Sequence, residues 1–274
     1  MRRSLIALAV LATLAVPSTA LAATRTAHAG KVTATLSWTG QIPNEKHVTL
    51  RIVRAGNAIL RTAVTAKTCG HSCDVLTGAK QPPIQVIDLD HTGEPNVVIS
   101  LYTGGAHCCS IAQVFTYGAA TRRYTMIQRD FGDPGFLVKD LGHNGQREFV
   151  TADDRFAYTF TDYAASGMPL QILALRGTRF TDVTSSYPAL VRTDAARYLS
   201  VYKQLAKSRY QDSVGVIAAW AADECTLGKS TTALAYVKAQ AKAGHLNSGF
   251  GAGDSGQKFV TKLERFLRRQ GYLS

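Results

Sequence analysis

The chain has 274 residues, of which 46% are hydrophobic and 18% are charged, and it carries 31 Lys and Arg against 19 Asp and Glu. This length and apolar content suffice for one large or two small packed domains and exclude a chain that is disordered throughout. Five cysteines are too few for a disulfide-dense scaffold.

The first 22 residues have the features of a cleaved signal peptide. A short basic start, Met1 to Arg3, precedes an apolar run over residues 5–16, and Ala20-Leu21-Ala22 has the small-x-small pattern read by signal peptidase. A membrane-spanning helix needs about 20 apolar residues, and no later run reaches that length. The sequence therefore predicts export to the periplasm, the cell envelope or the medium, with no transmembrane segment in the mature chain.

Residues 23–80 and 81–187 are predicted to form β-strands. Residues 32–38 and 48–52 alternate apolar with polar side chains, and residues 55–57 break the second run, which predicts a hairpin. In the middle third, short apolar runs of strand length are separated by Gly, Pro, Asn and Asp. These runs are 84–87, 97–101, 111–117, 124–127, 136–138, 149–150, 170–175 and 180–183.

Residues 188–274 change to a helical period. Apolar side chains repeat at spacings of three and four within 195–206, 214–221, 234–241 and 259–267, which predicts four helices. Asp254 with Gln257 is typical of a capping box for the last helix, and Gly271 is placed to end it.

An internal repeat lies in the middle third. Residues 87–93 and 139–145 share Asp, Leu, His and Gly in register at an offset of 52 residues, and each segment lies between strand-like runs. A period of about 50 residues with several strands per copy predicts propeller-like blades. The predicted fold class is therefore α+β, with an N-terminal antiparallel β region, two propeller-blade-like repeats within 81–187, and a C-terminal helical bundle.

The repeat resembles the FG-GAP/VCBS-type repeats of integrin-like β-propellers, whose blades carry a D-x-D-x-D-G-x-x-D loop between two strands. The matching oxygen-bearing residues are Asp88, Asp90, Thr92 and Asn96 in the first loop and Asp140, Asn144 and Glu148 in the second, where Gly142 replaces an acid. Such loops would hold a structural Ca²⁺, because this ion takes six to eight oxygen ligands. The alternative is that Asp and Asn bond to the backbone and shape a turn.

Two repeats cannot close a propeller of roughly four or more blades, so the N-terminal strands, the helices or another chain must complete any such structure. The segment Gly104-Gly105-Ala106-His107-Cys108-Cys109 also resembles a segment of exported proteins to which no activity is assigned. Neither resemblance implies a catalytic activity.

Four cysteines surround the first repeat. Export places them in an oxidising compartment, so we expect disulfides that join Cys69 and Cys73 to Cys108 and Cys109, because a bond between adjacent cysteines would strain the backbone. The alternative is a zinc or copper site in which His71 and His107 add imidazole ligands to these thiols. The fifth cysteine, Cys225, is predicted to be a buried free thiol.

The sequence contains no familiar catalytic motif, such as a G-x-S-x-G elbow, an H-E-x-x-H helix or a phosphate-binding loop. His107 beside Cys108 is a poor nucleophile–base pair, because adjacent side chains rarely aim at one point. Asp153, Asp154 and Asp162 are candidates for a paired-carboxylate hydrolase site, although Asp residues between strands usually shape turns. The sequence leaves open whether the protein is an enzyme and favours the view that it is not.

Charge divides the mature chain into three parts. Residues 23–80 carry 8 basic and 2 acidic side chains, residues 81–187 carry 8 and 11, and residues 188–274 carry 13 and 6. The positive charge is split between the two flanks without a basic run interleaved with aromatics, which excludes nucleic acid as a partner. We therefore expect a non-catalytic binding module for an envelope or extracellular protein or glycan. The alternatives are a hydrolase acting on an envelope polymer and a metal-handling protein.

Overall fold

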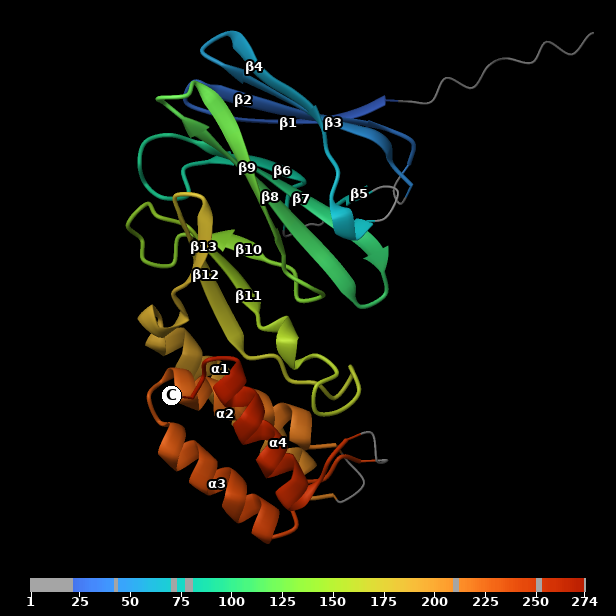
Figure 1. The fold of residues 1–274 in the computed structure, drawn as a ribbon, viewed down its shortest axis with the longest axis vertical. Helices are drawn as coiled ribbons and strands as arrows, with labels where there is room; N and C mark the ends of the chain where they lie inside the picture. The colour runs from blue at the N-terminus through green and yellow to red at the C-terminus, as the bar shows by residue number, and fades with distance from the viewer. Residues whose placement is uncertain are drawn as a thin grey trace, which may run out of the picture.

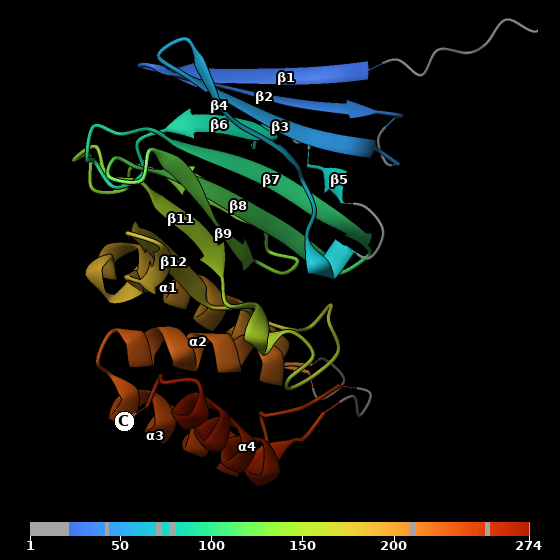
Figure 2. The ribbon, with the colours of Figure 1, turned by 45° about the horizontal axis from the view of Figure 1, so that its top comes forward.

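Three antiparallel β-sheets lie one above another, and four α-helices cover the last of them (Figures 1 and 2). This computed structural model describes residues 22–41, 44–69, 73–76, 81–208, 212–249 and 253–273. The predicted α+β class is confirmed, and no closed propeller is formed by the described residues. Apart from Ala22, the predicted signal peptide lies outside them.

The first sheet is an up-and-down meander in the order β1-β2-β3-β4. Its strands are β1 (Ala22–Ala29), β2 (Val32–Thr39), β3 (Lys46–Arg54) and β4 (Asn57–Ala63). The predicted hairpin is confirmed: Ala55 and Gly56, with φ of 47° and 82°, form its turn. Both residues lie in the left-handed region that tight hairpin turns require.

The second and third sheets are built from the middle of the chain. The second contains β5 (Asp74–Val75), β6 (Ile84–Ile87), β7 (Asn96–Gly105), β8 (Cys108–Gly118) and β9 (Arg123–Asp130). The third contains β10 (Leu137–Lys139), β11 (Glu148–Ala152), β12 (Leu170–Arg176) and β13 (Arg179–Asp182). Successive strands from β6 to β9, and from β10 to β13, pair antiparallel. All eight apolar runs predicted in this region are strands.

The second sheet is buried on both faces, because it lies between the other two. From β7, Val97 and Ile99 pack against the first sheet, while Val98 packs against the third. Side chains alternate between the faces of a strand, so two apolar neighbours in sequence enter two different cores. This explains why the sequence of β7 is continuously apolar rather than alternating.

The four predicted helices are confirmed. They are α1 (Pro188–Leu205), α2 (Val214–Thr226), α3 (Ser230–Lys242) and α4 (Gly256–Arg269). Phe156 and Phe160, from the connection between β11 and β12, are buried in the helical core. This connection, which begins with a short 3-10 turn (Asp154–Phe156), therefore joins the third sheet to the bundle. No helix among the described residues is long and apolar enough to span a membrane.

The ends of α4 confirm one prediction and correct another. Gly271, with φ of 83°, follows the helix, and Tyr272 N–H donates to Leu267 O (2.9 Å), as in a Schellman motif. The predicted capping box is wrong, because the N-cap residue is Ser255 and its side chain makes no capping hydrogen bond. Asp254 lies one residue earlier and pairs with Lys262 at 3.8 Å.

Candidate functional site

The two repeated acidic loops occupy equivalent places, because one joins β6 to β7 and the other joins β10 to β11. The Asp88 carboxylate accepts hydrogen bonds from the N–H groups of Thr92 (3.1 Å) and Gly93 (2.7 Å). Asp140 accepts from the residues four and five positions later at 3.1 and 3.0 Å. Each carboxylate therefore closes its own loop as a turn.

Two of the predicted calcium ligands are buried at the ends of these loops. Asn96 accepts from Leu89 N–H (3.1 Å), and Glu148 accepts from Leu141 N–H (3.2 Å). The Thr92 hydroxyl donates to Asp90 (2.9 Å). Within the described residues, no three or more His, Cys, Asp or Glu side chains gather as a metal site. The loop oxygens thus have protein donors as partners, which supports the alternative that they shape turns, although no contact tests calcium binding directly.

A thermal melt tests calcium binding. We expect the midpoint to be the same in CaCl2 and in EDTA, because backbone N–H groups already satisfy the carboxylates that would hold the ion. A ligand that binds only the folded state raises the midpoint with the logarithm of its concentration once this exceeds the dissociation constant. A midpoint that rises with Ca²⁺ and falls again in EDTA would contradict this expectation.

The two loops also contact each other. Arg147 N–H, in the second loop, donates to Leu89 O in the first at 2.9 Å. A Cβ on Gly145 would lie 2.3 Å from Nδ1 of His91, so a glycine is required where the His91 ring packs. On the other side, Glu94 of the first loop accepts from Arg54 Nη2 (2.6 Å) of the first sheet. The repeated loops therefore join successive sheets.

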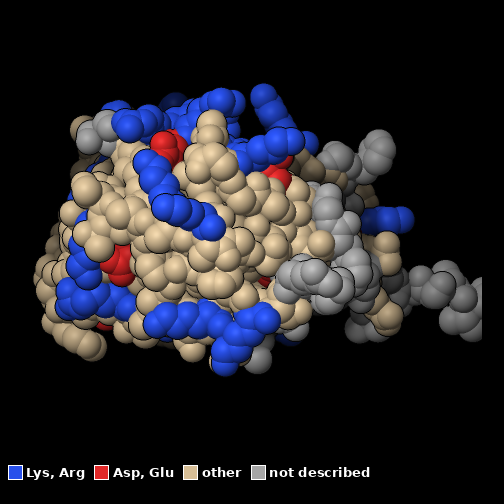
Figure 3. Space-filling view, turned by 90° about the horizontal axis from the view of Figure 1, so that it is seen from below, with Lys and Arg blue, Asp and Glu red and all other residues tan. Residues whose placement is uncertain are grey.

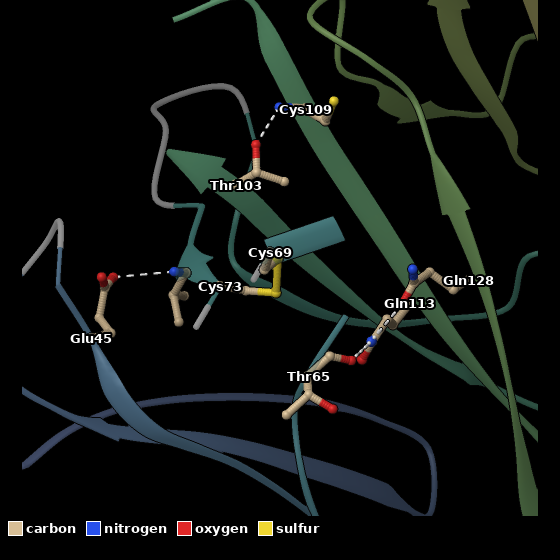
Figure 4. Close-up of a disulfide and its surroundings, with 9 residues drawn as sticks. Glu45, Thr65, Cys69, Cys73, Thr103, Cys109, Gln113 and Gln128 are labelled. Carbon is tan, nitrogen blue, oxygen red and sulfur yellow. Dashed lines mark hydrogen bonds between the residues drawn. A yellow bond between two sulfur atoms is a disulfide. The ribbon is translucent and has the colours of Figure 1, made fainter. Parts of the chain in front are cut away.

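The predicted disulfide pairing is wrong. Cys69 is bonded to Cys73, with their Cα atoms 5.0 Å apart, and Cys108 is paired with Cys109. The first bridge closes a short turn before β5, whereas Cys109 lies on β8 with its N–H donating to Thr103 Oγ1 (2.7 Å) (Figure 4). Each pair therefore forms within its own segment, although Asp74, beside Cys73, pairs with Tyr102 on the strand next to β8.

The structure also describes the fifth cysteine and one of the two histidines proposed as metal ligands. Cys225 is a buried free thiol, as predicted, and burial raises its pKa to about 11. Of the two histidines in the proposed metal set, His71 lies outside the described residues. His107 stacks on Tyr163 with ring centroids 4.1 Å apart.

Removing the Cys69–Cys73 bridge should have a modest effect on stability. The loop it closes is short, so the chain-entropy description gives about 2 kcal/mol for the double variant Cys69→Ser/Cys73→Ser. The measurement is urea unfolding of the wild type and the double variant. A loss above about 4 kcal/mol would contradict this estimate, because only a far longer loop gives so large an effect.

A polar cleft of about 290 Å³ lies where the second and third sheets meet the connection from β11 to β12. We use the name polar cleft for the surface formed by Cys109, Arg129, Asp130, Phe131, Gly132, Thr151, Ala152, Asp153, Asp154, Arg155 and Gln171. It brings charged groups from β9, β11 and the following turn to one place. Nothing in the spacing of the sequence indicated this cleft, because its walls meet only when the sheets stack.

Arg129 is the distinctive cation of the polar cleft. Its Nε–H is buried and has no hydrogen-bond partner among the described residues, while Nη2 makes a long contact with Gln171 (3.4 Å). Burial lowers the pKa of this guanidinium, an effect that Asp182 partly offsets. A buried donor without a partner costs about 1–3 kcal/mol.

The three aspartates proposed for catalysis have different roles. Asp153 is buried and accepts from Arg155 Nε (2.7 Å) and from the Tyr272 hydroxyl (2.9 Å), so it is structural. Asp162 is exposed and accepts from the N–H of Ala165 at 2.9 Å. Of the three, Asp154 is the partly exposed acid of the cleft, and it has no cation partner among the described residues.

Asp154 lies in an unusual electrostatic environment. Burial raises its pKa, and the neighbouring carboxylates Asp130, Asp133 and Asp153 raise it further, against a hydrogen bond from the Asp133 backbone that lowers it. A carboxyl group that holds its proton at higher pH can donate a hydrogen bond or act as a general acid.

An exposed row of aromatic rings adjoins the cleft. The ring of Tyr163 lies 4.1 Å from His107 and 5.3 Å from Tyr158, measured between centroids, and the Tyr163 hydroxyl bonds to Asp133. From the sequence, His107 was considered as a metal ligand and as a catalytic base, and neither tyrosine was predicted. Both tyrosines lie in a loop rich in small residues, where the sequence has no apolar periodicity that would mark them.

Basic side chains gather elsewhere. Seen from the helical end, Lys and Arg surround a broad surface without charge, and few acids are visible (Figure 3). Several of these cations are paired, as Lys238 is with Glu264 (2.8 Å) and Lys229 with Glu224 (3.5 Å). The polar cleft and the basic helical end are thus separate surfaces.

Comparisons with known proteins give two relatives. A probable thylakoid lumen protein of Synechocystis sp. is 35% identical over 178 residues, covering 61% of this chain and 51% of that protein. An uncharacterized protein of Sinorhizobium fredii is 25% identical over 199 residues, covering 71% of this chain and 30% of that protein. The chain thus spans about half of the length of the first relative and about a third of the second. No protein-family model and no solved structure matches it.

Proposed function

We propose that this protein is an exported, non-catalytic binding module whose ligand occupies the polar cleft. Two observations support export: the signal-peptide features of residues 1–22, and a relative described as a probable thylakoid lumen protein. The thylakoid lumen, like the periplasm, is separated from the cytosol by a membrane. The binding role rests on the cleft.

The observation that carries the binding role is the unpartnered Nε–H of Arg129. The guanidinium is held in place by Gln171 and by the rings of Phe131 and Phe180, which lie 5.6 and 5.9 Å away. A fixed, partly desolvated donor in a concave site orients a ligand without reorganisation. Folding alone gives this N–H no partner.

Screening of the purified protein against envelope glycans and proteins, followed by calorimetry on any ligand found, tests this proposal. We expect Arg129→Met to weaken binding at least tenfold, because it removes the donor and keeps the aliphatic stem. Arg179→Met on β13, where Arg179 is exposed, is the matched control and should bind like the wild type. Equal affinity of the Arg129 variant and the wild type would overturn the proposal.

We also infer that the second and third sheets are blade-like repeats of the FG-GAP/VCBS type. The support is that equivalent acidic loops join the first two strands of consecutive four-stranded meanders and close by the same two hydrogen bonds. The first sheet, another four-stranded meander, stacks on them and adds a third layer.

A second candidate function is hydrolysis of an envelope polymer, and the raised pKa of Asp154 favours it. Asp154 would protonate the leaving group, and the exposed Asp130 across the cleft would act as base. Incubation with glycan polymers and analysis of released fragments tests this role. Product formation by the wild type that Asp154→Asn abolishes would place hydrolysis ahead of binding.

A further inference from the structure

We propose that the ligand is a linear polysaccharide of uncharged sugar units, lying along a groove between the second and third sheets with one unit stacked on Tyr158. This inference rests on the proposed binding function and narrows it to one class of ligand.

The polar cleft is one part of a continuous groove. Hollows of about 380, 630, 290 and 410 Å³ follow one another from Lys139 to Tyr272. Consecutive hollows share lining residues: Leu137 belongs to the first two, Thr151 to the second and third, and Arg155 to the last two. A compact ligand fills one hollow of this size, whereas a row of connected hollows suits an extended chain.

The side chain of Tyr158 is exposed, and its backbone conformation lowers the stability of the folded protein. It is 60% exposed, and its φ of 58° lies in the left-handed region, where a bulky side chain is disfavoured by about 1–3 kcal/mol. Its N–H donates to Ser166 Oγ (3.1 Å), whose hydroxyl in turn donates to Asp162 O (2.7 Å). The loop therefore fixes an exposed ring in a strained conformation, as expected of a residue that contacts a ligand.

The row of rings lies beside the groove. Tyr163 lies between Tyr158 and His107, and its hydroxyl bonds to Asp133, which lines the largest of the four hollows. The three rings do not line the hollows themselves, so the bond from Tyr163 to Asp133 is the link by which a chain in the groove would reach the aromatic row. An aromatic face is apolar at its centre and can cover the C–H face of a pyranose ring, as it does other apolar groups.

The polar lining suits sugar hydroxyls. Gln85, which is partly exposed, offers both a donor and an acceptor in one plane, whereas Gln81 and Gln171 are buried and already bonded to Ser100 and to Asp182. Around the polar cleft, Asp130, Asp133, Asp153 and Asp154 outnumber the two arginines. This excess of negative charge disfavours an anionic polymer, so uncharged sugar units are the better fit.

Calorimetry with defined oligosaccharides tests the inference. The probes are β-1,4-linked glucose, N-acetylglucosamine and mannose oligomers of two and six units, titrated into the mature protein. We expect one six-unit series to bind at least tenfold more tightly than its two-unit form, because the longer chain occupies more of the connected hollows.

Variants of Tyr158 separate stacking from folding. Tyr158→Ala should weaken binding of the hexamer at least tenfold, and Tyr158→Phe should retain it within about twofold, because the ring remains. Tyr158→Gly should lose binding without any fall in melting temperature, because glycine relieves the left-handed strain. Met126→Ala, which removes an exposed apolar side chain from β9, is the control and should change neither quantity.

The outcomes distinguish this inference from the proposed function. If no oligosaccharide binds, or if Tyr158→Ala binds the hexamer like the wild type, the glycan inference is overturned. A ligand of another class whose binding depends on Arg129, such as an extended peptide, would overturn the inference and leave the proposed function standing. Glycan binding that Arg129→Met leaves unchanged would keep the glycan class and overturn the role given to the polar cleft.

Discussion

Replacing Asp223 with Asn should raise the free energy of unfolding at pH 7 by on the order of 2 to 4 kcal/mol. Asp223 lies in α2 and is 1% exposed, and burial raises its pKa to about 9. The neighbouring Asp194 raises that pKa further, both through its charge and through a hydrogen bond. Asn has the same shape as Asp and can still donate a hydrogen bond to Asp194, but it has no proton that titrates.

The sign of the pH dependence follows from the raised pKa. An unfolded Asp loses its proton near pH 4, whereas the folded protein retains it up to about pH 9, so the folded state binds more protons between these values. The contribution of Asp223 to stability is therefore fully present below about pH 4 and decreases as the pH rises towards 9. Arg197, which pairs with Asp194 at 2.6 Å, opposes this effect without cancelling it.

Urea unfolding at pH 5, 7 and 8.5 measures both predictions. The stability gained by Asp223→Asn should increase across this series, because the wild type weakens while the variant does not have the titrating group. Asp254→Asn, at an exposed Asp paired with Lys262, is the matched control and should change little. A gain that stays constant with pH would show that Asp223 does not titrate as described.

Asp153→Ala should lower the free energy of unfolding by about 3 kcal/mol or more. The buried carboxylate accepts from Arg155 Nε (2.7 Å) and from the hydroxyl of Tyr272 (2.9 Å). Its removal leaves that hydroxyl, which is itself buried, without its acceptor. Because Tyr272 follows α4, this carboxylate links the third sheet to the end of the chain.

Chemical denaturation of the Asp153→Ala and Asp162→Ala variants checks this difference. Asp162 is exposed and caps a single N–H, so its loss should cost less than about 1 kcal/mol. Equal losses in the two variants would contradict the structural role of Asp153. The result also bears on hydrolysis, since a loss of activity on removing Asp153 would reflect unfolding, whereas Asp154→Asn reports on the cleft itself.

The sequence predicted the strands and helices well where the apolar period was clear. Residues 32–38 alternate, and they form β2. Strand β1 was not predicted, because its sequence, AATRTAHA, consists of small and polar residues and shows no alternation of apolar with polar side chains. The cap of α4 was placed on Asp254 because Gln257 follows three residues later, whereas Ser255, the actual N-cap, is followed at that spacing by Lys258.

The functional surface was harder to predict for a different reason. Each acidic loop is one continuous stretch of sequence, so the correspondence between the two loops was visible at an offset of 52 residues. Arg129 lies on β9, whereas Asp154 and Tyr158 lie in the connection from β11 to β12, and no periodicity encodes the meeting of these two segments. The disulfide prediction failed because it excluded a pair of adjacent cysteines on the ground of backbone strain, whereas both pairs are local in sequence.

The stacking of sheets through their repeated loops makes the molecule a short one-dimensional array. The second sheet shares one core with the first and another with the third, while the helical core draws on the third sheet's connection. In such an array, stability depends on nearest-neighbour interfaces, and terminal layers can open while inner ones remain closed. Hydrogen exchange should therefore show β7 and β8 as the last backbone to open, with protection decreasing towards the first sheet.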